Sequence, residues 1–219
     1  MLQWRPELGT RAALVPRGSP DGLRWFDAEA FWVWHFANAF EAAAADGLIR
    51  IIIDFPRWNH LALDLSAPAS GGVVRAEIEP AHGSIRIDQR DDRVTEFPRI
   101  DDRRIGRPHR WFYVASKEHA GQPLPPGEWN ELSRYDMQTG EVVTRRAGSL
   151  RLGEPVFVPA GSVAAEDQGY VVMFATDAAT LESYFFILNA GDIAGEPAAT
   201  LRIPHRVPAG LHGCWVPER

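Results

Sequence analysis

The chain has 219 residues, of which 45% are hydrophobic and 24% charged, so it has the composition of a globular protein with one sizeable core. Its formal net charge of −6 argues against a polyanionic partner, because nucleic-acid binding normally requires a clustered basic face. No stretch approaches the roughly 20 consecutive apolar residues that a membrane-spanning helix needs.

The pattern along the chain predicts an all-β protein. Gly, Pro, Asp and Asn recur every ten or so residues, and the runs between them are rich in Val, Ile, Phe, Tyr and Trp. Strands are predicted at residues 12–16, 31–35, 48–55, 60–64, 73–79, 84–89, 110–116, 131–136, 142–146, 169–176, 183–189 and 199–203. A short helix is the expected exception at residues 39–46, where Glu41 precedes four alanines.

Turn residues indicate that neighbouring strands pair as hairpins. Residues 135–142 and the loop 189–192 both carry the Asp or Asn and the Gly that tight turns favour. Meanders of short antiparallel strands are typical of a propeller or a sandwich, and periodicity does not separate these two folds. The proline-rich stretch 122–127 is predicted to be a loop, and because hairpins resume beyond it, residues 1–219 are predicted to form one domain.

The single cysteine, Cys214, excludes an intramolecular disulfide and fits a reducing compartment. The first residues lack the apolar core and cleavage site of a signal peptide. Together these features predict a cytoplasmic protein. Cys214 itself is predicted to be a buried, unreactive thiol.

Two histidines are candidates for a metal site. His35 ends the aromatic run FWVWHF and is followed by small and polar residues. A lone histidine among aromatic residues is more often a hydrogen-bonded core residue than a ligand. The second, His212, lies between Gly210 and Gly213, where the backbone can bend tightly and be approached closely. Two such histidines far apart in the sequence favour one shared metal.

The segments around these histidines resemble the third and fourth histidine motifs of the carotenoid cleavage oxygenase family, which includes lignostilbene dioxygenases and the retinal-pigment-epithelium isomerase. Between them, residues 95–101 (TEFPRID) and 153–158 (GEPVFV) resemble the family's two C-terminal glutamate motifs, in the same order. Residues 4–18 resemble the segment that leads into the third histidine. Family members are much longer, and their first two iron histidines and a further glutamate lie upstream of anything present here. The chain therefore resembles a C-terminal half.

The resemblance implies a seven-bladed β-propeller, of which this chain would build about three or four blades. It also implies an Fe(II) ion held by four histidines, two of them His35 and His212. Glu96 and Glu154 would each accept a hydrogen bond from the far ring nitrogen of a ligand. The open strand edges of a partial propeller would be available for pairing with another chain.

The implied reaction is the cleavage of a conjugated C=C bond by O2 into two carbonyl products. The substrate would be a carotenoid, an apocarotenoid or a phenolic stilbene, and the sequence does not select among them. An alternative is a catalytically inactive β-module that binds a partner or self-associates. A hydrolase that uses Glu96 and Glu154 as an acid/base pair ranks last, because it leaves both histidine motifs unused.

Overall fold

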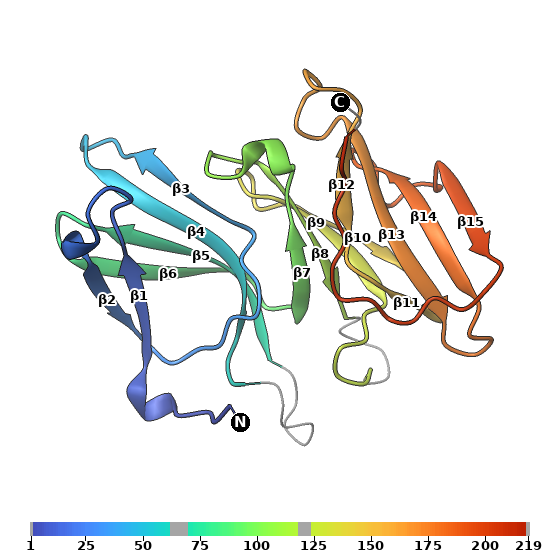
Figure 1. Cartoon of the computed structure of the whole chain (residues 1–219), viewed down its shortest axis with the longest axis horizontal. Coiled ribbons are helices and arrows are strands. Elements are labelled where there is room, and N and C mark those ends of the chain that lie inside the picture. Colours follow the sequence, from blue (N-terminus) through green and yellow to red (C-terminus); the bar gives the residue numbers. More distant parts are fainter. Residues whose placement is uncertain (1, 62–69, 118–123, 218–219) are drawn as a thin grey trace. The chain divides into compact units, whose positions relative to one another are not determined.

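The computed structural model of the protein describes residues 2–61, 70–117 and 124–217, and these form two compact units. Unit 1 consists of residues 1–94 with 106–108, and unit 2 consists of residues 95–105 with 109–219. Figure 1 shows both units as layers of strands joined by loops. A single domain for the whole chain stays a prediction.

Unit 1 contains a hairpin and a four-stranded antiparallel sheet in which the strands follow sequence order. Two 3-10 turns lie near the hairpin, η1 (Pro6–Leu8) and η2 (Pro20–Gly22). The hairpin is β1 (Thr10–Leu14) and β2 (Arg24–Ala28); the sheet is β3 (Asn38–Ala43), β4 (Ile49–Trp58), β5 (Gly71–Glu79) and β6 (Ser84–Asp91).

The sheet β3–β6 has one apolar face and one face on which charged residues lie among the buried Phe40 and Ile52, since side chains alternate between the two faces. Phe55, Val74 and Ala76 are buried on the apolar face and pack against Phe31. On the other face, Asp54 and Arg75 stand opposite each other and form a bidentate ion pair at 2.8 and 2.9 Å.

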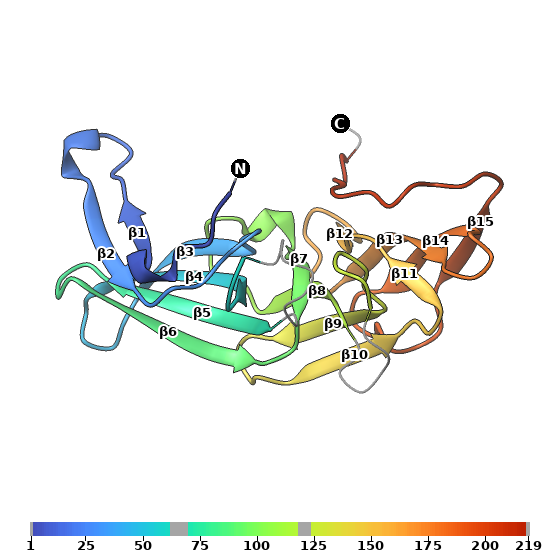
Figure 2. The ribbon, with the colours of Figure 1, turned by 90° about the horizontal axis from the view of Figure 1, so that it is seen from below.

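Unit 2 contains two further antiparallel sheets (Figure 2). The first is a meander of β7 (Thr95–Arg99), β8 (Trp111–Ser116), β9 (Glu131–Asp136) and β10 (Val142–Arg146), with the 3-10 turn η3 (Asp102–Arg104) after β7. The second contains β11 (Leu150–Leu152), β12 (Val156–Pro159), β13 (Gly169–Asp177), β14 (Ser183–Asn189) and β15 (Ala199–Ile203). Both β11 and β12 pair with β13.

The core of unit 2 lies between its two sheets. Tyr113 and Leu132, from β8 and β9, pack with Phe157, Met173 and Leu188 from the second sheet. The Tyr113 hydroxyl donates a hydrogen bond to the Ala190 carbonyl at 3.3 Å, and burial raises the pKa of this phenol. The buried hydroxyl of Tyr113 is therefore paired within the core.

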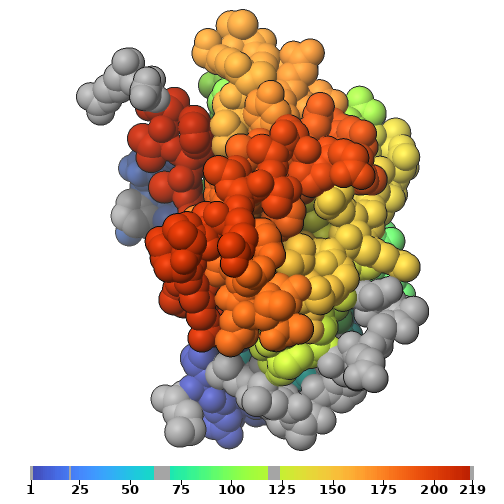
Figure 3. All heavy atoms as spheres, turned by 90° about the vertical axis from the view of Figure 1, so that its right-hand side faces the viewer, coloured from blue at the N-terminus to red at the C-terminus, as the bar shows by residue number. Residues whose placement is uncertain are grey.

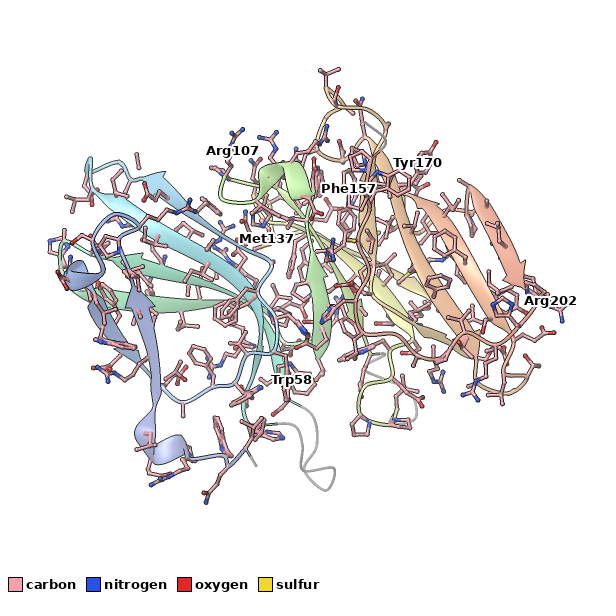
Figure 4. All side chains as sticks on the ribbon, viewed as in Figure 1. Trp58, Arg107, Met137, Phe157, Tyr170 and Arg202 are labelled. Atoms are coloured by element: carbon pink, nitrogen blue, oxygen red, sulfur yellow. The ribbon has the colours of Figure 1, made fainter. Side chains whose placement is uncertain are left out.

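The second sheet is apolar on its other face as well. Met173 is 3% exposed in the core, whereas the next residue, Phe174, points to the opposite face and is 48% exposed. Phe174 stacks edge-on against Phe185 of β14, with ring centroids 4.9 Å apart. Figure 4 labels one residue of each face at the same end of the sheet, Phe157 of the core face and Tyr170 of the opposite face. We call this opposite side the outer face of the sheet β11–β15.

The all-β class and the meanders of short antiparallel strands predicted from the sequence are confirmed. The predicted turn at residues 135–142 is also present: Gly140 has φ +79°, and the Asp136 carboxylate accepts hydrogen bonds from the amides of Gln138 and Thr139. The strands β2, β3, β7, β11 and β12 were not predicted. Most of the predicted strand 60–64 lies outside the described residues.

Two local predictions were wrong. Residues 31–35 form no strand, because the Thr10 hydroxyl takes both the amide and the carbonyl of Phe31, and only Trp32 then bridges to Trp58. Residues 39–46 form no helix. Instead β3 pairs with β4 and buries Asn38 and Phe40 alternately, so tertiary pairing outweighs the helix propensity of the alanines.

Candidate functional site

The last described part of the chain, residues 204–217, has no regular secondary structure; we call it the strap. It leaves β15 and returns across the outer face of the sheet β11–β15 toward β12 (Figures 1 and 2). Figure 3 shows it in red at the surface beside the orange strands. Near the start of the strap, the Val207 amide donates a hydrogen bond to the Ser183 hydroxyl of β14 at 2.8 Å.

His212 lies on this strap and contacts Glu154, two residues before β12. Its Nδ1 atom is 3.3 Å from Glu154 Oε1, and the amide of the next residue, Gly213, donates to Glu154 Oε2 at 2.7 Å. The Glu154 side chain is only 7% exposed, whereas that of His212 is 54% exposed. One carboxylate therefore holds both the imidazole and the backbone beside it.

Arg99, at the end of β7, closes the same cluster from the other side. Its Nη1 atom donates to the Gly213 carbonyl at 2.9 Å and lies 3.3 Å from Glu154 Oε1. A buried carboxylate is costly unless charged or polar donors surround it. Arg99, the Gly213 amide and the His212 ring supply those donors.

Phe97 and Glu96 precede Arg99 on β7. The Phe97 ring stands edge-on to the His212 imidazole, with centroids 6.0 Å apart and planes at 87°. Glu96 is 5% exposed, and its Oε2 atom accepts a hydrogen bond from the Phe97 amide at 2.9 Å. The TEFPR segment thus places an aromatic ring and a guanidinium beside the strap.

The hydrogen bond to Glu154 has a chemical consequence for His212. A neutral imidazole has one protonated nitrogen and one with a free lone pair. When Nδ1–H donates to the carboxylate, Nε2 is the atom that carries the lone pair and can act as a ligand. A carboxylate on the far nitrogen also fixes the ring's orientation.

The structure thus brings together three of the four sequence motifs, those of Glu96, Glu154 and His212. His35 belongs to unit 1, where it is half-buried in the irregular stretch between Trp32 and β3. Its sharing of a metal with His212 stays a prediction. In the described part of the chain, no group of three or more His, Cys, Asp or Glu side chains gathers as a metal site.

A cavity of about 710 Å³ lies between the strap and the outer face, and His212 and Glu154 are among its lining residues. Apolar side chains from the sheet, including Val156, Val172 and Phe174, form most of its wall. Cys214 also lines it and is exposed, so the prediction of a buried thiol was wrong. The prediction rested on the usual burial of free cysteines, whereas the strap lies open on the surface.

The sequence did not single out Arg99 or Phe97 as contacts of the histidine. Both lie inside the TEFPRID segment, so their position next to a motif glutamate was the available signal. What the sequence lacked was the backbone path, because Phe97 has the left-handed φ of +55° and the β7–β8 register shifts between Glu96 and Arg99.

The all-β fold and the contact of His212 with Glu154 fit the family whose histidine and glutamate motifs the sequence resembles. The chain belongs to the RPE65 (retinal pigment epithelial membrane protein) family, that of the carotenoid cleavage oxygenases, whose model matches residues 1–217. Among the described residues, no helix is long and apolar enough to span a membrane.

Similar proteins include a carotenoid cleavage oxygenase of Mycobacterium tuberculosis, 33% identical over 98% of this chain and 44% of the relative's length. An isoeugenol monooxygenase of Pseudomonas nitroreducens is 31% identical over 100% of this chain and 48% of its own. Cobalt-substituted Synechocystis ACO, a solved structure, superposes with a TM-score of 0.83 at 29% identity, covering 94% of this chain and 43% of that one. The chain thus spans less than half the length of these relatives.

Proposed function

We propose that this chain is the C-terminal portion of an Fe(II)-dependent oxygenase that cleaves a conjugated C=C bond of a carotenoid, an apocarotenoid or a stilbene-like phenol. The observation that carries the proposal is the His212–Glu154 pair, in a chain of a family whose relatives are named carotenoid, apocarotenoid and isoeugenol oxygenases. The chain then contributes about three or four blades of a seven-bladed propeller.

The donor chemistry at His212 fits ferrous iron. Neutral imidazole is a good ligand for this ion, and a carboxylate on the far nitrogen is the usual support of a metal-binding histidine. In this proposal His212 and His35 are two of the ligands, and Glu154 and Glu96 accept hydrogen bonds from ligand rings. Ferrous iron, when bound, supplies the redox chemistry that combines O2 with an electron-rich alkene.

The residues of this chain have three tasks in the proposed site. Glu154 keeps the proton of His212 on Nδ1 and sets the plane of the ring. Phe97 limits the ring from the side, at a centroid distance of 6.0 Å. The apolar outer face of the sheet β11–β15 keeps water from one side of the histidine.

Completion by a further portion of a family oxygenase is part of the proposal. His35 and His212 alone make a weak site, because metal affinity depends on the number of ligands and on their supporting hydrogen bonds. The apolar outer face and the edge of β15, which pairs only with β14 among the described strands, favour a partner that adds sheet structure. The same apolar face favours the second candidate, a catalytically inactive module that associates through it.

Anaerobic reconstitution with ferrous iron tests the two candidates. The chain alone is expected to bind less than one tight equivalent of iron, measured by elemental analysis after desalting. Co-expressed with the N-terminal portion of a family oxygenase, it is expected to bind one equivalent, to lose it in His212→Ala, and to cleave an apocarotenoid or isoeugenol into carbonyl products. His82→Ala is the control, because His82 is exposed and pairs with Glu79.

Iron that stays bound in His212→Ala would exclude His212 as a ligand. A complex that forms but neither binds iron nor cleaves either substrate would favour the inactive module. A tight equivalent on the chain alone would show that this chain supplies a complete site without a partner.

A further inference from the structure

Arg99 occupies an unusual place in unit 2, because one of its terminal nitrogens serves both the strap and the glutamate that holds His212. Nη1 donates to the Gly213 carbonyl at 2.9 Å and lies 3.3 Å from Glu154 Oε1. On the other branch, Nη2 is 3.4 Å from Asp102 Oδ2. The Arg99 side chain is 18% exposed. Acceptors on two sides therefore fix the guanidinium plane.

Gly213 is held at both of its backbone groups by this ion pair. Its amide donates to Glu154 Oε2 at 2.7 Å and its carbonyl accepts from Arg99 at 2.9 Å. Glycine, Glu154 and Arg99 thus form a closed ring of contacts. Because Gly213 follows His212 directly, the ring of contacts also fixes the backbone from which the imidazole projects.

The backbone of β7 is shaped to deliver Arg99 to this place. Phe97 adopts φ +55°, a conformation that residues other than glycine rarely take, and it does so directly before Pro98. The β7–β8 register shifts between Glu96 and Arg99, as at a β-bulge, which re-aims the side chains that follow. Phe97 and Arg99 consequently both meet the strap.

We infer that Arg99 is a positioning residue that orients His212 by clamping Gly213 and Glu154 at the same time. Without Arg99, the Gly213 carbonyl loses its charged donor and Glu154 loses its cation, so the strap detaches at this point. With the strap free, Nδ1 of His212 no longer meets a fixed carboxylate. The orientation itself needs no metal, and its consequence for iron rests on the proposed function.

Hydrogen exchange on the metal-free chain tests the clamp. In Arg99→Ala, the amide of Gly213 is expected to exchange about tenfold faster than in the wild type. The reason is that the strap can then open around Gly213 at a lower free-energy cost, without unfolding of the unit. Nitrogen-15 NMR of His212 at a pH where the ring is neutral is expected to show a mixed Nδ1–H and Nε2–H population in place of mainly Nδ1–H. Arg145→Ala is the matched control: Arg145 holds the carbonyls of Ala194 and Gly195, at 3.4 and 2.6 Å, and is expected to change neither readout.

Arg99→Lys keeps the charge but has no planar fork, so it is expected to give exchange between the wild type and Arg99→Ala. It also serves if the alanine variant does not fold. Wild-type exchange and tautomer in a folded Arg99→Ala, or in Arg99→Lys when the alanine variant fails to fold, would overturn the inference.

Iron affinity of the completed enzyme separates the two proposals. When exchange and tautomer change in Arg99→Ala and iron affinity falls on the order of 10- to 100-fold, both proposals are supported. When exchange and tautomer change and iron affinity does not, the clamp stands and His212 is not a ligand.

Discussion

The sheet β3–β6 of unit 1 and the sheet β11–β15 of unit 2 are both antiparallel, but their second faces differ in composition. The first has its Asp54–Arg75 ion pair there and a further pair, Arg86 with Glu77, at 3.0 Å. The second places Phe174 and Phe185 there, beside the strap. The charges on the second face of the first sheet pair with each other, whereas an exposed apolar face gains free energy from any cover.

This difference shows which sheet needs packing from residues outside the sheet itself. In the sheet β3–β6 the charged residues of the second face, among them Asp54 and Arg75, pair within the sheet itself. Apolar residues on both faces are typical of a sheet that is packed on both sides. In unit 2 the strap, which carries His212, supplies part of that packing.

The largest expected effect comes from breaking the ion pair of the charged face. Asp54 is fully buried and Arg75 has 19% of its side chain exposed, so Asp54→Asn leaves a largely desolvated cation. We expect the free energy of unfolding to fall by about 3–5 kcal/mol, measured by urea denaturation. The double variant Asp54→Leu/Arg75→Met is expected to recover part of this loss. A loss below about 1 kcal/mol in the single variant would mean that the Asp54–Arg75 ion pair contributes little to the stability of unit 1.

A pair of neighbouring residues compares the two faces of the sheet β11–β15 directly. Met173→Ala removes a side chain from the core and is expected to cost about 2–5 kcal/mol. Phe174→Ala removes a half-exposed ring and its stack on Phe185, and is expected to cost about 1 kcal/mol. Both losses are measured by urea denaturation of the chain alone. Equal losses would show that the outer face is already packed like a core.

The partner of the outer face can be sought with the same residue. Phe174→Lys places a charge on the apolar surface and is expected to reduce self-association of the chain, measured by light scattering against concentration. Trp25→Lys is the control, because Trp25 is 50% exposed but belongs to unit 1. Equal reduction in both variants would mean that general surface charge, and not this face, controls association.

The smallest effect expected is on pH dependence. The side-chain hydrogen bond from Arg50 lowers the pKa of Asp46, at the β3–β4 turn, below its ordinary value of 3.8. A lowered folded pKa stabilises the turn above that ordinary value, and the contribution is lost as the pH falls through the folded pKa. Amides such as that of Leu48, which donates to Asp46 at 3.0 Å, are expected to lose protection factor as the pH falls below 3.8. In Asp46→Asn the protection factor should stay flat over this range; a parallel fall there would assign the effect to another group.

The sequence was most informative where local chemistry and tertiary structure agree. The β-branched run of β5 and the aromatic run of β14 are strands as predicted, and the Asp136 turn follows from its own residues. The strand prediction failed at residues 31–35. There the hydroxyl of Thr10, distant in sequence, pairs with the amide and the carbonyl of Phe31 in place of a neighbouring strand.

At the site, the motifs located Glu154 and His212 but not the contact that fixes them. Glutamate and histidine can be assigned from a motif, because their residue types carry the chemistry. The role of Arg99 depends on the left-handed backbone at Phe97 and on the path of the strap. Neither can be read from composition or periodicity.

The doubly apolar sheet also has a consequence for strand register. A slip by one residue exchanges the two faces, and in the sheet β3–β6 it would bring Arg75 into the core. On β13 the same slip merely exchanges Met173 for Phe174, so hydrophobicity scarcely penalises it. The turn between β13 and β14, where Asp177 accepts from the amides of Ala179 and Thr180 at 2.8 and 2.9 Å, then adds to the shape of the core in setting their alignment. In this sheet a turn aspartate thus helps to specify which residues face inward.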